Sequence, residues 1–217
     1  MNRRMLASSL LMSVALVPAS LSAKDFSDVT EDGLVRVPSN RKAGVYRAPD
    51  VGFAHYRRIM LVPASVTFKK NWDRMNPGLK PSERERIGDD LVRFFHEELV
   101  AELVERGGFA LAESPAPDVL RIDPSIVNLD ITAPDAGSTP GTRSFARTAG
   151  SMTLIVELRD AASGVIVGRV IDHEQAREFH DLQLVNQVTN AEEARVAFAN
   201  AARYTRSAIN VAKTDRN

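Results

Sequence analysis

The chain of 217 residues contains no cysteine, one tryptophan and four histidines, and its charges cancel. Without cysteine it can form no disulfide, no thiolate metal site and no thiol nucleophile. The 28 basic residues are matched by 28 acidic ones, so there is no basic excess to neutralise phosphates. The composition therefore predicts that the protein has no nucleic-acid partner.

Long hydrophobic runs are also scarce, and the clearest one lies at the N-terminus. Arg3 and Arg4 precede an apolar run of 13 residues, 5–17, which is broken only by serines. Such a run is shorter than the ~20 residues that a membrane-spanning helix needs. Small residues follow it, and the whole pattern predicts a secretory signal peptide over residues 1–23. Cleavage is expected after Ala23 or, alternatively, after Ala19; an uncleaved membrane anchor is the other interpretation.

Removal of residues 1–23 takes away two arginines, so the chain from Lys24 onward has 26 basic and 28 acidic residues and a net charge of −2. No later run approaches the length of a membrane span, so we expect no transmembrane span after processing. The expected location is the periplasm, with secretion as the alternative. The processed chain is long enough for one ordinary domain, which we place at residues 56–213 after an extended lead-in at 24–55.

The clearest structural pattern is a β-hairpin at residues 150–172. Two alternating apolar runs flank the turn residues 160–164, in which Gly164 is the natural site for a positive φ. In the first run four apolar side chains fall on one face of the strand: Met152, Leu154, Val156 and Leu158. The hairpin is therefore predicted to be part of the core scaffold.

Two long amphipathic helices are predicted on either side of this region. In the first, Ser82 is the expected N-cap, Glu85 completes a capping box, and apolar residues recur at helical spacing until Gly107 and Gly108. The second is expected to begin at Asn190, with Glu193 three residues later. Its apolar stripe consists mostly of small side chains: Ala194, Ala197, Phe198, Ala201, Thr205, Ala208, Ile209 and Ala212.

Further strands are expected at residues 59–62, 66–68 and 119–132, the last bent at Pro124. Shorter apolar runs at 34–37, 44–47 and 109–111 are candidates for short strands. Helices of this length need an apolar surface to cover, and the strands supply one. The predicted fold is α/β (α+β): a mixed sheet of about four to five strands with two long helices packed on it, in the order β-α-β-β-β-α.

Several landmarks give the chain a family resemblance. An aspartate and an aromatic residue, a tyrosine, a strand that ends in proline, a tryptophan and a closing Asp-x-x-Ser-Gly turn follow one another as Asp50, Phe53, Tyr56, Pro63, Trp72 and Asp160 to Gly164. In this order and spacing the chain resembles the exported bacterial proteins of domain-of-unknown-function family 3313. Many members look like lipoproteins, whereas this chain has no cysteine to carry a lipid. The resemblance implies no catalytic residues.

The histidine segment is the only local cluster with metal-ligand character. It contains His173 with Glu174 and His180 with Asp181, and the spacing of seven residues would place both imidazoles on one face of a helix. The segment does not match His-Glu-x-x-His, and a zinc site needs three or four ligands. We therefore assign no metal site and no cofactor, and keep these four residues as the candidates if a metal is bound.

Other catalytic motifs are missing. Residues 137–142 lack the Gly-Lys-Ser/Thr ending of a phosphate-binding loop, and no serine stands in a Gly-x-Ser-x-Gly context. Trp72 is expected either to recognise a ligand from its loop or to pack that loop onto the domain. Arg57 and Arg58 are expected either to bind an anion or to mark a charged strand start.

The leading functional hypothesis is an exported, non-catalytic binding or structural accessory of the cell envelope, with envelope proteins or an outer-membrane-associated complex as partners. One alternative is a periplasmic enzyme or metal-binding protein with a site near residues 173–181. Another is a small-ligand-binding module in which residues 133–149, rich in glycine, serine, threonine and proline, form a lid.

Overall fold

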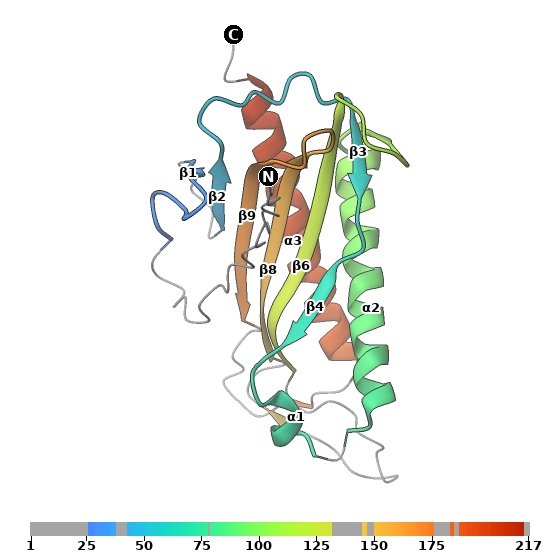
Figure 1. Cartoon of the computed structure of the whole chain (residues 1–217). Coiled ribbons are helices and arrows are strands. Elements are labelled where there is room, and N and C mark those ends of the chain that lie inside the picture. Colours follow the sequence, from blue (N-terminus) through green and yellow to red (C-terminus); the bar gives the residue numbers. More distant parts are fainter. Residues whose placement is uncertain are drawn as a thin grey trace, which may run out of the picture.

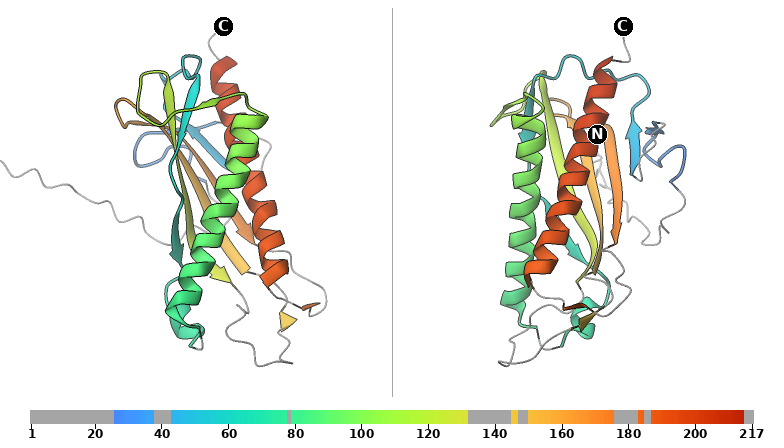
Figure 2. Two further views of the ribbon diagram at one scale, coloured as in Figure 1. Left: turned by 90° about the vertical axis from the view of Figure 1, so that its right-hand side faces the viewer. Right: turned by 180° about the vertical axis from the view of Figure 1, so that it is seen from behind.

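The structure is a computed structural model that describes residues 26–37, 43–77, 79–131, 145–146, 150–175, 183–184 and 187–214. One mixed sheet forms one layer, and both long helices cover the same face of it (Figures 1 and 2). The opposite face of the sheet carries no helix among the described residues. The predicted signal peptide at 1–23 lies outside the described residues.

The hairpin is formed as predicted. Strand β8 (Gly150–Asp160) pairs antiparallel with β9 (Ile166–Gln175). The Asp160 carboxylate accepts hydrogen bonds from the backbone N–H and the hydroxyl of Ser163, both at 2.7 Å, and Gly164 has φ +74°. Three of the four apolar side chains assigned to one face are 1% exposed, namely Leu154, Val156 and Leu158, and Met152 packs against the core from its margin.

Strand β6 (Val119–Ile131) lies in the middle of the sheet between β8 and two shorter strands. It pairs antiparallel with β8, and parallel with β3 (Arg58–Leu61) and then β4 (Ser65–Phe68). Pro124 falls between the last β3 pair, at Ile122, and the first β4 pair, at Ser125. A proline, which has no N–H to donate, is therefore tolerated in a central strand because the parallel partner changes there.

The sheet has eight strands instead of the expected four to five. Its order is β1-β2-β9-β8-β6-β3-β5, and β4 pairs with β6 off this path. The additional strands are β1 (Val35–Arg36), β2 (Gly44–Arg47) and β5 (Ala110–Leu111). All three lie within the apolar runs at 34–37, 44–47 and 109–111 that are candidates for short strands in the sequence, and the expected number was too low because these candidates were not counted with the main strands. A separate two-stranded sheet joins β7 (Phe145–Ala146) to β10 (Gln183–Leu184).

The expectation of two long helices is confirmed. They are α2 (Pro81–Val100) and α3 (Gln187–Thr214), and a single helical turn, α1 (Trp72–Met75), precedes them. Between the helices the rings of Phe95 and Phe198 stack at 4.7 Å with an interplanar angle of 16°, and both are fully buried. The small residues Ala197 and Ala201 on α3 are also buried, so this helix lies close to the sheet.

The predicted helix starts are wrong by a few residues. Helix α2 has Lys80 as its N-cap, and the Glu83 carboxylate accepts the Lys80 backbone N–H at 2.8 Å, so Ser82 lies inside the helix. Pro81 at the first helical position explains the shift, because its fixed φ suits that position and it has no N–H to satisfy. Helix α3 begins three residues before Asn190.

The end of α2 is joined to α3 by a buried carboxylate. A π-helical turn, η1 (Ala101–Glu105), follows α2, and the chain then turns at Gly108 with φ +71°. The side chain of Glu102 is only 7% exposed and accepts hydrogen bonds from Arg106 at 2.7 Å and Arg206 at 2.8 Å. Burial alone would raise the pKa of Glu102, but the hydrogen bonds from Arg206 and Arg106 outweigh burial and hold the pKa below its ordinary 4.5.

The Glu102 network predicts an acid-dependent loss of stability. A carboxylate with a lowered pKa stabilises the fold above pH 4.5, and this contribution is lost as the pH falls through its folded-state pKa. Glu102→Gln should lower the free energy of unfolding by about 1–3 kcal/mol at pH 7, and by much less at pH 3. Urea unfolding of the wild type and of Glu102→Gln at pH 7 and pH 3 measures this difference. The other carboxylates titrate in both proteins, so their contribution cancels when the two free energies of unfolding at one pH are subtracted. An equal difference at both values would contradict the assignment.

Candidate functional site

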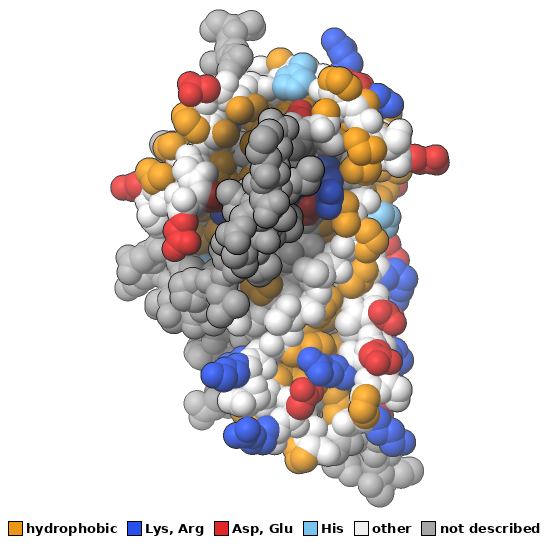
Figure 3. Space-filling model, viewed as in Figure 1, with side chains coloured by type: hydrophobic (Ala, Val, Ile, Leu, Met, Phe, Trp, Pro, Cys, Tyr) orange, Lys and Arg blue, Asp and Glu red, His pale blue; other side chains and the backbone are white. Residues whose placement is uncertain are grey.

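A groove runs between β4 and the N-terminal half of α2 and has a volume of about 750 Å³. Strand β4 and the residue before it supply one wall, with Ala64, Val66 and Phe68; α2 supplies the other, with Arg84, Glu85, Gly88, Asp89 and Val92. Figure 1 shows β4 and α2 side by side and running in opposite directions. In Figure 3 hydrophobic side chains appear at the surface among charged ones in the lower part of this view. The groove is thus an open channel of mixed character.

One backbone edge of the β4 wall is unpaired as far as the structure describes the chain. Within the described part of the chain β4 pairs only with β6. The backbone N–H of Lys69 donates to the Leu129 carbonyl at 2.9 Å, which fixes the side of the strand that faces β6. Because the backbone groups of successive residues point to opposite sides, the N–H and C=O groups of Val66 and Phe68 point away from β6. This edge offers donors and acceptors to an added strand.

The α2 wall contains a glycine that packing does not require. Gly88 lies in the interior of α2, and a Cβ built on it would meet no heavy atom within 4 Å. Its φ is not in the left-handed region, so the backbone conformation is open to any residue. Glycine in a helix interior costs about 1 kcal/mol relative to alanine. The groove is therefore wider at Gly88 than the fold itself demands.

Charge on the α2 wall is unevenly compensated. Arg84 pairs with Asp73 at 3.2 Å and lies over the Phe68 ring at 4.7 Å. Glu85 and Asp89 are exposed, stand four residues apart on the same face of the helix, and have no ion-pair partner among the described residues. Two neighbouring carboxylates on a surface that borders apolar side chains favour a basic ligand group.

Trp72, the only tryptophan in the sequence, packs against the Phe68 end of this groove. Trp72 is 1% exposed, and its ring lies 4.5 Å from that of Phe68. Of the two expectations for Trp72, the structure supports packing, because a buried ring cannot recognise a ligand from the surface. Trp72 instead holds the end of β4, and with it the lower end of the groove, against the domain.

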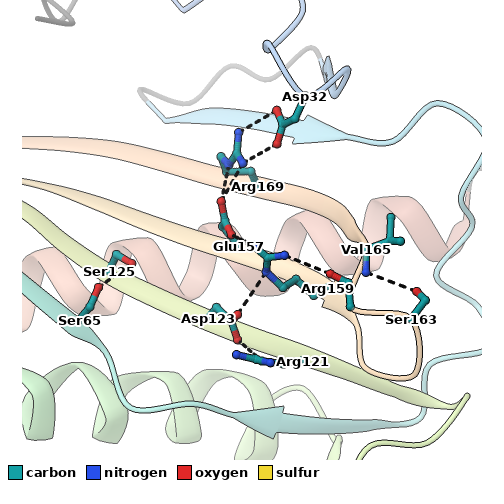
Figure 4. A network of polar contacts seen from close by, with 11 residues as sticks. Asp32, Ser65, Arg121, Asp123, Ser125, Glu157, Arg159, Ser163, Val165 and Arg169 are labelled. Atoms are coloured by element: carbon teal, nitrogen blue, oxygen red, sulfur yellow. Dashed lines mark hydrogen bonds and ion pairs between the residues drawn. The ribbon is translucent and has the colours of Figure 1, made fainter. Parts of the chain in front are cut away.

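The helix-free face of the sheet carries a chain of alternating charges (Figure 4). Asp123 lies between Arg121 at 2.7 Å and Arg159 at 3.2 Å. Glu157 lies between Arg159 and Arg169, which contact it at 2.5 and 2.7 Å. The i, i+2 spacing of these residues within β6 and β8 places them on one face. The sequence could not reveal the network, because the pairing across strands depends on the register.

Asp32 completes this network from the segment before β1. Arg169 donates to both Asp32 oxygens, at 3.1 and 2.6 Å. Burial alone would raise the pKa of Asp32, but the hydrogen bond from Arg169 and its charge outweigh burial and lower the pKa. Every carboxylate in the network is thus occupied by a guanidinium, so the network ties strands together and leaves no free acid for catalysis.

Arg58 is likewise engaged in a structural pair, and the expected anion site at Arg57 and Arg58 loses one of its cations. The Arg58 guanidinium donates to both Asp118 oxygens, at 2.8 and 2.6 Å. This pair joins the start of β3 to the residue before β6, and it supports the interpretation of a charged strand start.

The histidine candidates are separated from one another as far as the structure describes them. His173 lies in β9, where its Nδ1 is 2.9 Å from the Thr153 hydroxyl and its ring stacks on Phe26 at 5.5 Å. Burial lowers the pKa of His173. Glu174 is the next residue of a strand and therefore points to the other face. The strand excludes the helical placement that the seven-residue spacing would have required for His173. His180 and Asp181 lie outside the described residues, within which no three potential metal ligands come together.

The structure describes only part of the segments on which the lid and membrane-anchor hypotheses depend. Of residues 133–149, only Phe145–Ala146 and their pairing with β10 are described. None of the helices in the described ranges has the length and apolar character needed to cross a membrane.

Three of the sequence landmarks meet at one end of the sheet. The Tyr56 hydroxyl donates to the Asp160 carboxylate at 3.0 Å, and Phe53 packs edge-on against Tyr56 at 5.7 Å. Burial alone would raise the pKa of Asp160, but the hydrogen bonds from Ser163 and Tyr56 outweigh it and lower the pKa. Burial and the bond to Asp160 raise the pKa of Tyr56, so it stays a donor. These landmarks hold the hairpin turn to the residues before β3 and are structural.

The described residues form a mixed α+β fold with a groove beside β4. Residues 20–204 match the family described as protein of unknown function, DUF3313, and the chain belongs to that family. No curated protein matches the sequence.

The solved structures to which the chain is similar are distant from it. A PelC dodecamer from Paraburkholderia phytofirmans is 12% identical, with a TM-score of 0.40 over 73% of this chain and 96% of that one. Protein XCC0632 from Xanthomonas campestris is 10% identical, with a TM-score of 0.43 over 75% and 89%. A neuraminyllactose-binding hemagglutinin homolog from Helicobacter pylori is 14% identical, with a TM-score of 0.32 over 78% and 89%.

Proposed function

We propose that the protein is exported to the periplasm and acts there without catalysis, as a binding or structural accessory of the cell envelope. The observation that carries this proposal is the groove beside β4, in which a widened helix wall faces a strand edge that no described residue pairs with. Such a surface suits a polypeptide ligand, because an added strand gains main-chain hydrogen bonds and side-chain contacts at once. The signal-peptide pattern supports the location.

The test combines location with contact in the cell. Fractionation should recover the chain, shortened at its N-terminus, from the periplasmic or envelope fraction. A photo-crosslinking amino acid placed at Asp89 in the groove should yield an adduct with an envelope protein. The same amino acid at Arg203, which is exposed on α3 outside the groove, is the matched control and should yield none. Recovery of unprocessed protein from the cytoplasm, or turnover of a small molecule without any adduct, would contradict the proposal.

A further inference from the structure

We infer that the groove between β4 and α2 takes an extended segment of a partner polypeptide with basic side chains on alternate residues, which adds to the open edge of β4 as an extra strand. The inference rests on the proposed function, because it names the class of partner that the groove binds.

The backbone geometry comes from β4. The outward N–H and C=O groups of Val66 and Phe68 are four hydrogen-bonding groups in the order that a neighbouring strand requires. An unpaired edge is usually blunted by a charge, a proline or a cover, because it otherwise pairs with another chain. Here the Lys69 ammonium is held by Asp130 at 2.6 Å on the β6 side, away from the open edge. No residue that the structure describes pairs with this edge, so it can accept a strand from a partner.

The dimensions of the two walls match. From Arg84 to Val92 the helix rises about 12 Å. From Ala64 to Phe68 the chain spans about 13 Å in extended conformation. An extended segment of four to five residues therefore lies along both walls at once. Alternate side chains of that segment point toward α2, and the missing side chain at Gly88 gives them room midway along the helix.

The charges select basic side chains. Two or three residues of such a segment face α2, where they meet Glu85 and Asp89 beside the apolar surface of Val66 and Phe68. A lysine or arginine satisfies both environments, because its aliphatic stem covers apolar surface while its charge reaches a carboxylate. Arg84 is already paired with Asp73 and does not oppose this, and Lys80 lies at the helix start, at one end of the groove.

The first experiment measures binding of a defined probe to the protein purified as the cell processes it. The probe is a fluorescein-labelled peptide of eight residues that alternates lysine with valine; the comparison peptide has glutamate for every lysine. Fluorescence anisotropy should show binding of the lysine peptide, weakening as salt rises, and at least ten-fold weaker binding of the glutamate peptide. Equal binding of the two peptides, or none by either, would overturn the inference.

Variants with matched controls locate the binding. The double variant Glu85→Gln, Asp89→Asn should weaken lysine-peptide binding about five-fold, whereas Asp90→Asn, one residue along the helix and outside the groove lining, should leave it unchanged.

Gly88→Gln should weaken lysine-peptide binding about ten-fold by filling the groove, while removal of a helix glycine keeps the fold at least as stable. Ser82→Gln, exposed on the same helix, is its control. Equal effects of variants and controls would rule the groove out.

Hydrogen exchange then tests strand addition itself. The Val66 and Phe68 amides, which point outward, should exchange fast in the free protein and slowly with the lysine peptide bound. The Lys69 amide, already bonded to Leu129, should be protected in both states. Protection of Val66 and Phe68 in the free protein that rises with protein concentration would mean that a second copy occupies the edge, and would overturn the inference. If only these tests fail while the Asp89 adduct forms in the envelope, the proposed function stands without this ligand.

Discussion

Leu154→Asp is expected to abolish folding. Leu154 is 1% exposed in β8 and pairs with Ile126 of β6 and Asp172 of β9, in the middle of the sheet and beneath the helices. The substitution removes a leucine from a close-packed core and places a carboxylate there with no designed partner. Such changes cost more than about 4–5 kcal/mol, which is comparable to the whole stability of many domains.

Thr153→Asp is the matched control, because it introduces the same carboxylate one residue away on the opposite face of β8. Thr153 is partly exposed beside His173, so the free energy of unfolding should change by less than about 1 kcal/mol. Circular dichroism and urea unfolding compare the two variants with the wild type. If Leu154→Asp unfolds at the wild-type midpoint, the assignment of faces along β8 is wrong.

Long periodic segments were predictable because their pattern and their burial have the same cause. The alternation in β8 and the helical spacing around Leu91, Phe95 and Leu99 each reflect one face turned to a common core. Local turn chemistry was predictable for the same reason, since Gly108 and Gly164 adopt the positive φ that few other residues tolerate.

The errors come from features that depend on tertiary contacts. Strands β1, β2 and β5 coincide with short apolar runs that are candidates for strands in the sequence, but at two to four residues they depend on pairing with their neighbours, so the sequence alone could not decide whether they join the sheet. The start of α2 was placed too late because Ser82 is a stronger capping residue than Lys80, yet Pro81 and the Glu83–Lys80 bond define the N-terminus.

The sequence contained almost no signal for the candidate site. Its elements were predicted separately, but the groove arises because β4 leaves the path of β3 and pairs with β6 beside α2. One signal was present: Gly88 lies inside a run that otherwise favours a helix and does not end it, although glycine there costs about 1 kcal/mol relative to alanine. In the structure no neighbouring atom requires a glycine at this position, and the residue lines the groove.

Phe198→Ala is expected to cause the second largest loss of stability. The Phe198 ring is fully buried and stacks on Phe95 at 4.7 Å, so it joins the two long helices over the sheet. Its neighbours Ala194, Ala197 and Ala201 are too small to move into the space that it would leave. Truncation of a buried phenylalanine costs about 3–5 kcal/mol, and for a domain of this size the melting temperature should fall by about 10–15 °C.

Phe94→Ala is the matched control, because it removes the same ring from the margin of the same helix pair. Phe94 lies between the guanidinium groups of Arg93 at 4.4 Å and Arg195 at 3.9 Å and is only partly buried. Its loss removes exposed cation–π contacts, each worth about 0.5–1 kcal/mol, and leaves no enclosed cavity. The melting temperature should therefore fall less than half as far as in Phe198→Ala. Equal losses would show that the helices are held together at their exposed margin, by the arginines around Phe94, as strongly as by the buried stack of Phe95 and Phe198.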